Sequence, residues 1–200
     1  MTRAGLRLVV RLGAAALLAG CALPPAEPAV TSSLIDQLPA DLPRGPRAPL
    51  TLLVLGPQAR PAYDTKRMAY SLRPHHLAYY GRNEWAETPP QMLQPLLVRA
   101  LEATGRFQAV LVPPHAGAAT HSLQVDVQEL LQDFEAQPPV LRLVLHAQVV
   151  DAARQVVASR EFAARQAMGE ATPAGGVRAA NEATARLVRE LAAFVLEQAR

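Results

Sequence analysis

The stretch VLRLVLHAQVVDAARQVVASREFA, residues 140–163, decides the fold expected for this chain. Its first half alternates Leu141, Leu143 and Leu145 with more polar or smaller residues, which is the period of a strand with one buried face. The four residues 151–154 then separate it from a second strand-like run, 155–163. The stretch therefore predicts a β-hairpin whose two strands pack one face on a core.

The rest of the chain predicts further strands and two helices. Strands are expected over 50–55, 66–72, 76–80, 107–112 and 123–128, where apolar runs or alternation occur. Thr88, Pro89 and Gln91 are typical of a helix start, and Gly105 of its end. Gly175-Gly176 precedes a second helical pattern over 177–198. We expect an α+β fold in a single domain, with a largely antiparallel sheet and the two main helices packed on one face.

The N-terminus carries an export pattern. Three arginines precede a seven-residue apolar run, Leu12–Leu18, far below the roughly 18 residues of a membrane-spanning helix. Leu18-Ala19-Gly20-Cys21 resembles the lipobox of bacterial lipoproteins. That resemblance predicts a signal peptide at 1–20, cleavage between Gly20 and Cys21, and lipidation of the Cys21 sulfur. Cys21 is the only cysteine, so we expect no disulfide in the mature chain.

A proline-rich segment follows the lipobox. Residues 22–49 hold seven of the eighteen prolines, which disfavour helix and inner strand. We expect a tether over 21–48, with a reach of roughly 80 Å at the polyproline rise, and a globular domain over 49–200. Within the tether, Leu34-Ile35 and Leu38 are candidates for local docking. The chain has 20 basic and 17 acidic residues, and three of the basic ones lie in the signal peptide. The mature part is balanced, so nothing favours nucleic acid as a partner.

The polar residues predict no catalytic, metal or cofactor site. His75 and His76 are strand neighbours that point to opposite faces, and no spaced ligand pair accompanies them. The serines, Ser159 among them, lack a nucleophile-elbow context. Asp126 and Glu129 lie three residues apart, on opposite faces of a regular strand, so they make a poor acid–base pair.

The aromatic residues are unevenly distributed. All four tyrosines and the sole tryptophan fall within residues 63–85, although aromatics make up only 4% of the chain. Two interpretations fit this cluster: the core of a small hairpin layer, or a contact surface for a partner protein. The residues concerned are Tyr63, Tyr70, Tyr79, Tyr80 and Trp85.

Several blocks together resemble the ABC-type transport auxiliary lipoprotein family, whose members include the PqiC/YmbA-like intermembrane transport lipoproteins. The blocks are Tyr63–Tyr70, His76–Tyr80, Glu84-Trp85, Thr88-Pro89, Met92-Leu93, Leu101–Phe107, Val149–Ala152, Glu161-Phe162 and Gly175–Asn181. The resemblance covers most of 50–195, while 22–48 departs from it.

The resemblance implies a non-enzymatic, lipid-anchored partner of an MCE-type ABC transport system, which moves lipid between the inner and outer membranes. The implied partner is the MCE-domain protein, with the permease and ATPase contacted indirectly, and a homo-oligomeric ring is compatible with the family. Ala22 is not the aspartate that commonly retains lipoproteins in the inner membrane, so an outer-membrane anchor facing the periplasm is expected.

Two other functions remain open from the sequence. A lipid or other apolar ligand could bind in the cleft between helices and sheet. A hydrolase would need a nucleophile–base pair that the sequence does not place.

Overall fold

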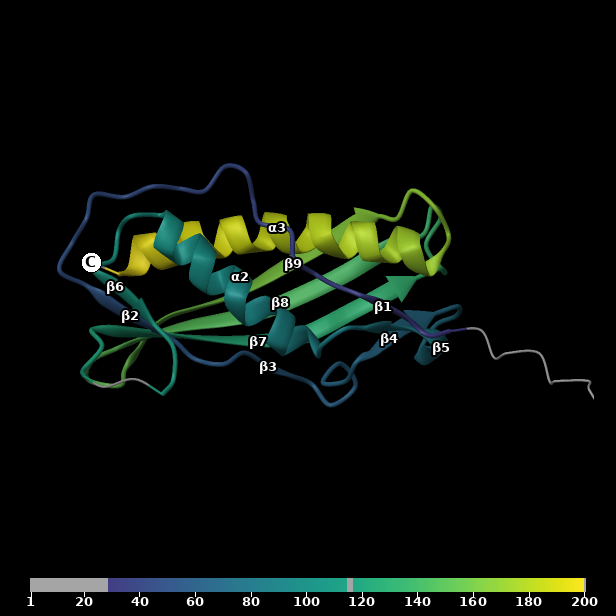
Figure 1. Cartoon of the computed structure of the whole chain (residues 1–200), viewed down its shortest axis with the longest axis horizontal. Helices are drawn as coiled ribbons and strands as arrows, with labels where there is room; N and C mark the ends of the chain where they lie inside the picture. Colours follow the sequence, from purple (N-terminus) through teal and green to yellow (C-terminus); the bar gives the residue numbers. More distant parts are fainter. Residues whose placement is uncertain (1–28, 115–116, 200) are drawn as a thin grey trace, which may run out of the picture.

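Three long strands form the base of the domain (Figure 1). The structure is a computed structural model that describes residues 29–114 and 117–199. β8 (Val140–Asp151) pairs antiparallel with β9 (Val156–Ala167), which confirms the predicted hairpin, and with β7 (His121–Asp133) on its other side. Leu141, Leu143 and Leu145 are buried, as their alternation predicts.

Shorter strands line the free edge of β7. β2 (Thr51–Val54), β3 (Gln58–Ala59) and β4 (Arg67–Ser71) each pair with β7 in parallel, one after another along its length. β6 (Ala109–Leu111) extends the sheet beside β2, also in parallel. β5 (Ala78–Trp85) pairs antiparallel with β4, and β1 (Thr31–Ser33) lies parallel to β5.

The sheet is mostly antiparallel, as expected, and it also contains short parallel pairs that the sequence did not predict. The long ladders of β7, β8 and β9 are antiparallel, whereas the short strands join β7 in parallel. Alternation shows that a segment is a strand with one buried face, but it carries no information on the direction of a partner distant in sequence.

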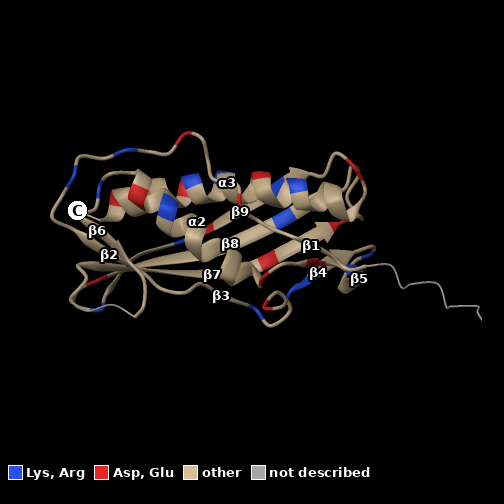
Figure 2. Cartoon of the chain, in the orientation of Figure 1, with Lys and Arg blue, Asp and Glu red and all other residues tan. Residues whose placement is uncertain are grey.

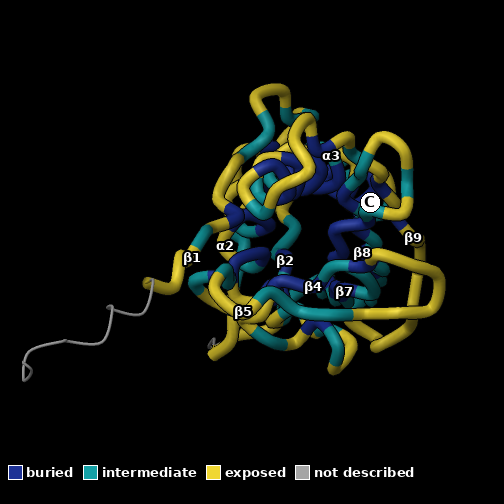
Figure 3. The backbone as a smooth tube through the Cα atoms, turned by 90° about the vertical axis from the view of Figure 1, so that its right-hand side faces the viewer, coloured by how far each residue is buried: buried dark blue, intermediate teal, exposed yellow. Residues whose placement is uncertain are grey.

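Two helices cover one face of this sheet, as expected (Figure 1). α2 (Pro89–Ala103) begins after Thr88, whose backbone N–H donates to Gln91 Oε1 at 3.0 Å, and it continues through Pro95. α3 (Pro173–Gln198) begins earlier than predicted, because the Thr172 hydroxyl accepts a hydrogen bond from the Gly175 N–H. Both helices direct apolar residues into one core between helices and sheet (Figure 3).

The two glycines lie inside the first turn of α3, where they allow close packing. A Cβ on Gly175 would overlap the Glu170 carbonyl oxygen, and a Cβ on Gly176 would overlap the side-chain amide of Gln132 on β7. The prediction that Gly175-Gly176 precede the helix is wrong because this contact, invisible in the sequence, requires residues without side chains.

Residues 34–48, which we call the strap, pack on the domain and correct the predicted tether. Ile35 is buried in the core, and the Ala48 N–H donates to the Arg106 carbonyl. Asn181 of α3 binds the strap near its start: its Oδ1 accepts from the Asp36 and Gln37 N–H groups at 2.9 and 3.0 Å. The ordered unit thus includes β1 and the strap, so a boundary at 49 and a free segment over 29–48 are wrong.

The prediction of a free tether fails because prolines prevent a helix but do not prevent an extended chain from packing on the domain. The strap runs back along the domain from β1 to β2, over the helical layer (Figure 1). Among the described residues, no helix combines the length and apolarity that crossing a membrane requires.

Candidate functional site

A polar groove lies beside the loop that joins β4 to β5, on the sheet face away from the helices. Its volume is about 420 Å³. One wall is the β4–β5 loop with residues 73–77, and the other comes from β7 and β8. The side chains that line it include Tyr63, Ser71, Arg73, Glu129, Asp133 and Arg142.

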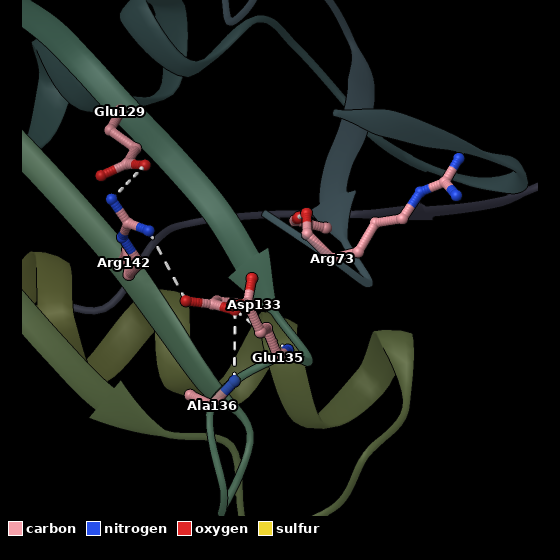
Figure 4. A network of polar contacts seen from close by, with 7 residues as sticks. Arg73, Glu129, Asp133, Glu135, Ala136 and Arg142 are labelled. Atoms are coloured by element: carbon pink, nitrogen blue, oxygen red, sulfur yellow. Dashed lines mark hydrogen bonds and ion pairs between the residues drawn. The ribbon is translucent and has the colours of Figure 1, made fainter. Parts of the chain in front are cut away.

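Arg142 organises the floor of this groove (Figure 4). Its guanidinium contacts Glu129 Oε1 at 2.9 Å and Asp133 Oδ2 at 3.5 Å, so two carboxylates share one cation. Asp133 Oδ1 also accepts from the backbone N–H groups of Glu135 and Ala136, which fixes the turn after β7. Arg73 points away from these carboxylates (Figure 4), and its carbonyl accepts the Ser71 hydroxyl.

A β-bulge in β7 places Asp126 on the same face of the sheet as Glu129 of the groove. The register of β7 against β8 shifts between Val127 and Glu129. A bulge inserts one extra residue into a strand, so residues three apart on either side of it lie on the same face instead of opposite faces. Asp126 and Glu129 therefore both lie on the open face of the sheet. The sequence-based assignment to opposite faces is wrong for this reason, and no local signal in the sequence marks the bulge.

Tyr63 forms part of the groove wall and is 8% exposed. Burial raises the pKa of its hydroxyl, and the nearby carboxylate of Glu129 raises it further. Tyr63 therefore remains a neutral hydrogen-bonding group. The groove offers carboxylate oxygens and hydroxyls to a polar ligand.

The aromatic cluster supports the loop beside the groove. Trp85 is 2% exposed and belongs to the core, so the core interpretation holds for it as for Tyr63. The Tyr70 and Tyr80 rings stack with centroids 4.5 Å apart, and Tyr80 donates to Gln132 Oε1. The Tyr79 hydroxyl donates a hydrogen bond to the Ala62 carbonyl. The Arg67 guanidinium carbon lies over the Tyr79 ring, 3.9 Å from the ring centroid. Contact of these residues with a partner stays a prediction.

The structure also brings together two residues that the sequence left apart. The Ser159 hydroxyl lies 2.8 Å from His146 Nε2, across the β8–β9 ladder, and His146 pairs directly with Asp126 of β7. The alternation along β8 places His146 on the polar face of that strand. Only the register between β8 and β9 shows that Ser159 lies beside it. Neither Ser159 nor His146 lines the polar groove or the apolar pocket described next, so they form a cross-strand polar contact on an open surface.

A small apolar pocket lies between the helices and the sheet. It is lined by Ile35 of the strap, Leu93 of α2, Thr184 of α3 and Leu143 of β8, with a volume of only about 20 Å³. That space holds about one water molecule, far less than the roughly 300 Å³ or more typical of ligand sites.

Within 29–114 and 117–199, no three metal-ligating side chains gather into a group that could hold a metal ion. His75 and His76 both border the groove, on the exposed loop. The signal peptide, Gly20 and Cys21 lie outside the described residues.

The family model for the ABC-type transport auxiliary lipoprotein component matches residues 33–192. The chain belongs to this family. Membership places it among lipoproteins anchored to a membrane of the cell envelope. The match begins in β1 and includes the strap, in agreement with the docked position of these residues.

Two solved structures share the fold of this family member, and one curated protein is similar in sequence. Protein XCC0632 from Xanthomonas campestris is similar with a TM-score of 0.72 at 24% identity, over 86% of this chain and 95% of that chain. The protein CT253 from Chlamydia trachomatis has a TM-score of 0.51 at 14% identity, over 76% and 98% of the two chains. The uncharacterized protein bll6063 of Bradyrhizobium diazoefficiens is 29% identical over 107 residues, which are 54% of this chain but 29% of that protein.

Proposed function

We propose that this protein is the lipid-anchored auxiliary subunit of an MCE-type ABC transport system and docks that system at the outer membrane. The observation that carries the proposal is the family match over residues 33–192, because the family consists of ABC-type transport auxiliary lipoproteins. The protein would contribute binding and position, with no catalytic step of its own.

The sequence supplies the anchor in this proposal. The lipobox Leu18–Cys21 follows a positive and then an apolar segment, so the Cys21 sulfur takes the lipid after cleavage behind Gly20. Ala22 lacks the acidic group associated with inner-membrane retention, which supports the outer membrane as the destination and the periplasm as the compartment of the domain.

The partner in this proposal is an MCE-domain protein that carries lipid across the periplasm. A homo-oligomeric ring of this chain would present several copies of each surface to such a conduit. Trp85 and Tyr63 would act from within, because buried aromatic side chains hold the β4–β5 region in shape rather than touching the partner.

The alternative, a lipid held between helices and sheet, receives less support. The apolar pocket there has about 20 Å³, whereas one acyl chain needs a space of hundreds of cubic ångströms. Lipid in that position would require the strap residue Ile35, which lines the pocket, to leave it.

Cross-linking in intact cells followed by purification in mild detergent tests the docking role. The expected result is recovery of an MCE-domain protein with the native chain. The matched variant Ala22→Asp keeps Cys21 and introduces the retention residue, so it should remain lipidated, move to the inner membrane and lose this recovery. Failure to recover any MCE-domain protein with the native chain would contradict the proposal.

Mass analysis of the purified native protein addresses the alternative and the ring. A co-purifying lipid besides the covalent anchor would favour the alternative, whereas light scattering in detergent measures the number of copies.

A further inference from the structure

The loop between β4 and β5 exposes apolar side chains. Leu72 is 66% exposed, the highest value for a large apolar residue among those the structure describes, and Leu77 at the other side of the loop is 40% exposed. Val30, just before β1, is 55% exposed. Exposed apolar residues gathered at one end of a domain indicate a surface that a membrane or a partner protein covers.

The chain enters the domain at this same end. β1 runs parallel beside β5, with Thr31 opposite Asn83, so Val30 lies beside the part of β5 that follows the β4–β5 loop. Figure 1 shows β1 beside β5 at this end of the domain. The opposite end holds the C-terminus and the β8–β9 turn.

The number of residues before β1 limits how far the domain can stand from an anchor at Cys21. Cys21 and Ala29 are eight residues apart, which span at most about 29 Å when fully extended. Continuing the register of Thr31 with Asn83 places Ala29 level with Gly81, and Leu77 lies four residues before Gly81, or about 13 Å along the strand. Tether, strand length and the spacing of about 5 Å between neighbouring strands together keep the loop within about 47 Å of the acylated sulfur, close enough to reach the membrane that holds the anchor.

The charge of the loop fits an anionic surface. Arg73 and Arg82 are exposed, and Arg73 turns away from the carboxylates of the groove (Figure 4). Two of those carboxylates, Glu129 and Asp133, are paired with Arg142, and Glu135 also borders the groove. Basic positions lie along the ribbon near β4 and β5 at this end of the domain (Figure 2). Arginine next to exposed leucine is the combination that binds the interface of an anionic bilayer.

We propose that the β4–β5 loop, residues 72–77, rests in the surface of an anionic phospholipid bilayer. Leu72 and Leu77 lie among the acyl chains, and Arg73 and Arg82 lie at the phosphates. This inference rests on the proposed lipidation of Cys21, which holds the loop at the membrane. The consequence is a fixed orientation, in which the β8–β9 turn and the C-terminus point away from the membrane, toward any partner in the periplasm.

A fluorescent label at single positions tests this orientation. The full-length protein with Leu72→Cys would be purified from membranes, labelled with an environment-sensitive dye and placed in vesicles of phosphatidylethanolamine and phosphatidylglycerol. Val156→Cys is the matched control, because Val156 is also an exposed apolar residue (56%) and lies at the opposite end. Intact-mass measurement of each protein verifies that Cys21 carries its lipid and that one thiol is labelled.

The expected result is a blue-shifted emission at position 72 that brominated acyl chains quench several-fold more strongly than emission at position 156. Equal exposure of both labels in a lipidated protein would overturn the proposal. A blue shift at 72 without quenching would indicate a second protein chain and would also overturn it. An absent lipid in the mass measurement would instead contradict the anchor on which the proposed function depends.

Discussion

Substitution of Asn181 by alanine should release the strap from α3. The Asn181 side chain makes three hydrogen bonds to the strap: two accepted from the Asp36 and Gln37 N–H groups and one donated to the Leu34 carbonyl at 3.0 Å. Each hydrogen bond contributes about 0.5–1.5 kcal/mol net, and these exposed ones lie at the lower end because water replaces the lost partner. Asn181→Ala should therefore lower the free energy needed to release the strap from the domain by about 2 kcal/mol.

Hydrogen exchange followed by mass spectrometry measures this loss locally. Exchange at Asp36 and Gln37 should accelerate about 30-fold, which is what 2 kcal/mol corresponds to. If release of the strap is coupled to unfolding of the domain, the melting temperature should also fall by about 4–8 °C.

The matched control is Arg189→Ala, which removes another contact between the same helix and the same strap. Arg189 Nη1 contacts Asp41 Oδ2 at 3.0 Å, but their side chains are 42% and 76% exposed, so solvent screens the pair. This variant should change exchange little. Unchanged protection of Asp36 and Gln37 in Asn181→Ala, or an equal effect of the two variants, would refute the reasoning.

Three further predictions concern the core. Trp85→Ala should lower the free energy of unfolding by about 3–5 kcal/mol in urea titration, because the indole is 2% exposed; loss of partner recovery at unchanged stability would contradict this. Gly176→Ala should cost about 1–3 kcal/mol because its Cβ would overlap the Gln132 amide, whereas Gly81→Ala, with open space around it, should not; equal melting temperatures would argue against the close packing. Burial raises the pKa of Tyr80 to about 12, so the folded state retains a proton that the unfolded state loses near pH 10. Stability from this group should be constant below about pH 10 and fall between about pH 10 and 12, and Tyr80→Phe should remove that fall; identical pH profiles of the two proteins would refute it.

The lipid anchor gives one more test. Cys21→Ala removes the acceptor sulfur, so metabolic labelling with a fatty-acid analogue should mark the native chain and leave the variant unmarked. Label on the alanine variant would contradict the lipobox assignment.

Much of the fold follows from patterns within a few residues of each other. The alternation at Leu141, Leu143 and Leu145 marks a strand with one buried face, and Thr88, Pro89 and Gln91 mark the start of α2. These features depend on side-chain period and on local hydrogen bonds, so the sequence alone reports them. The candidate groove is different, since Arg142 meets Glu129 and Asp133 only after two strands pair in a register that a bulge shifts.

By itself, the sequence determined all strands except β1 and β3, both helices, the family and the predicted anchor, because each is written in neighbouring residues. Only the tertiary structure decided the parallel pairing of the short strands on β7 and the docking of the proline-rich strap. Those features depend on contacts such as that between Asp36 and Asn181, 145 residues apart in the chain. A local pattern cannot encode which distant surface an extended segment will meet, because that choice is made by the packing of the whole core.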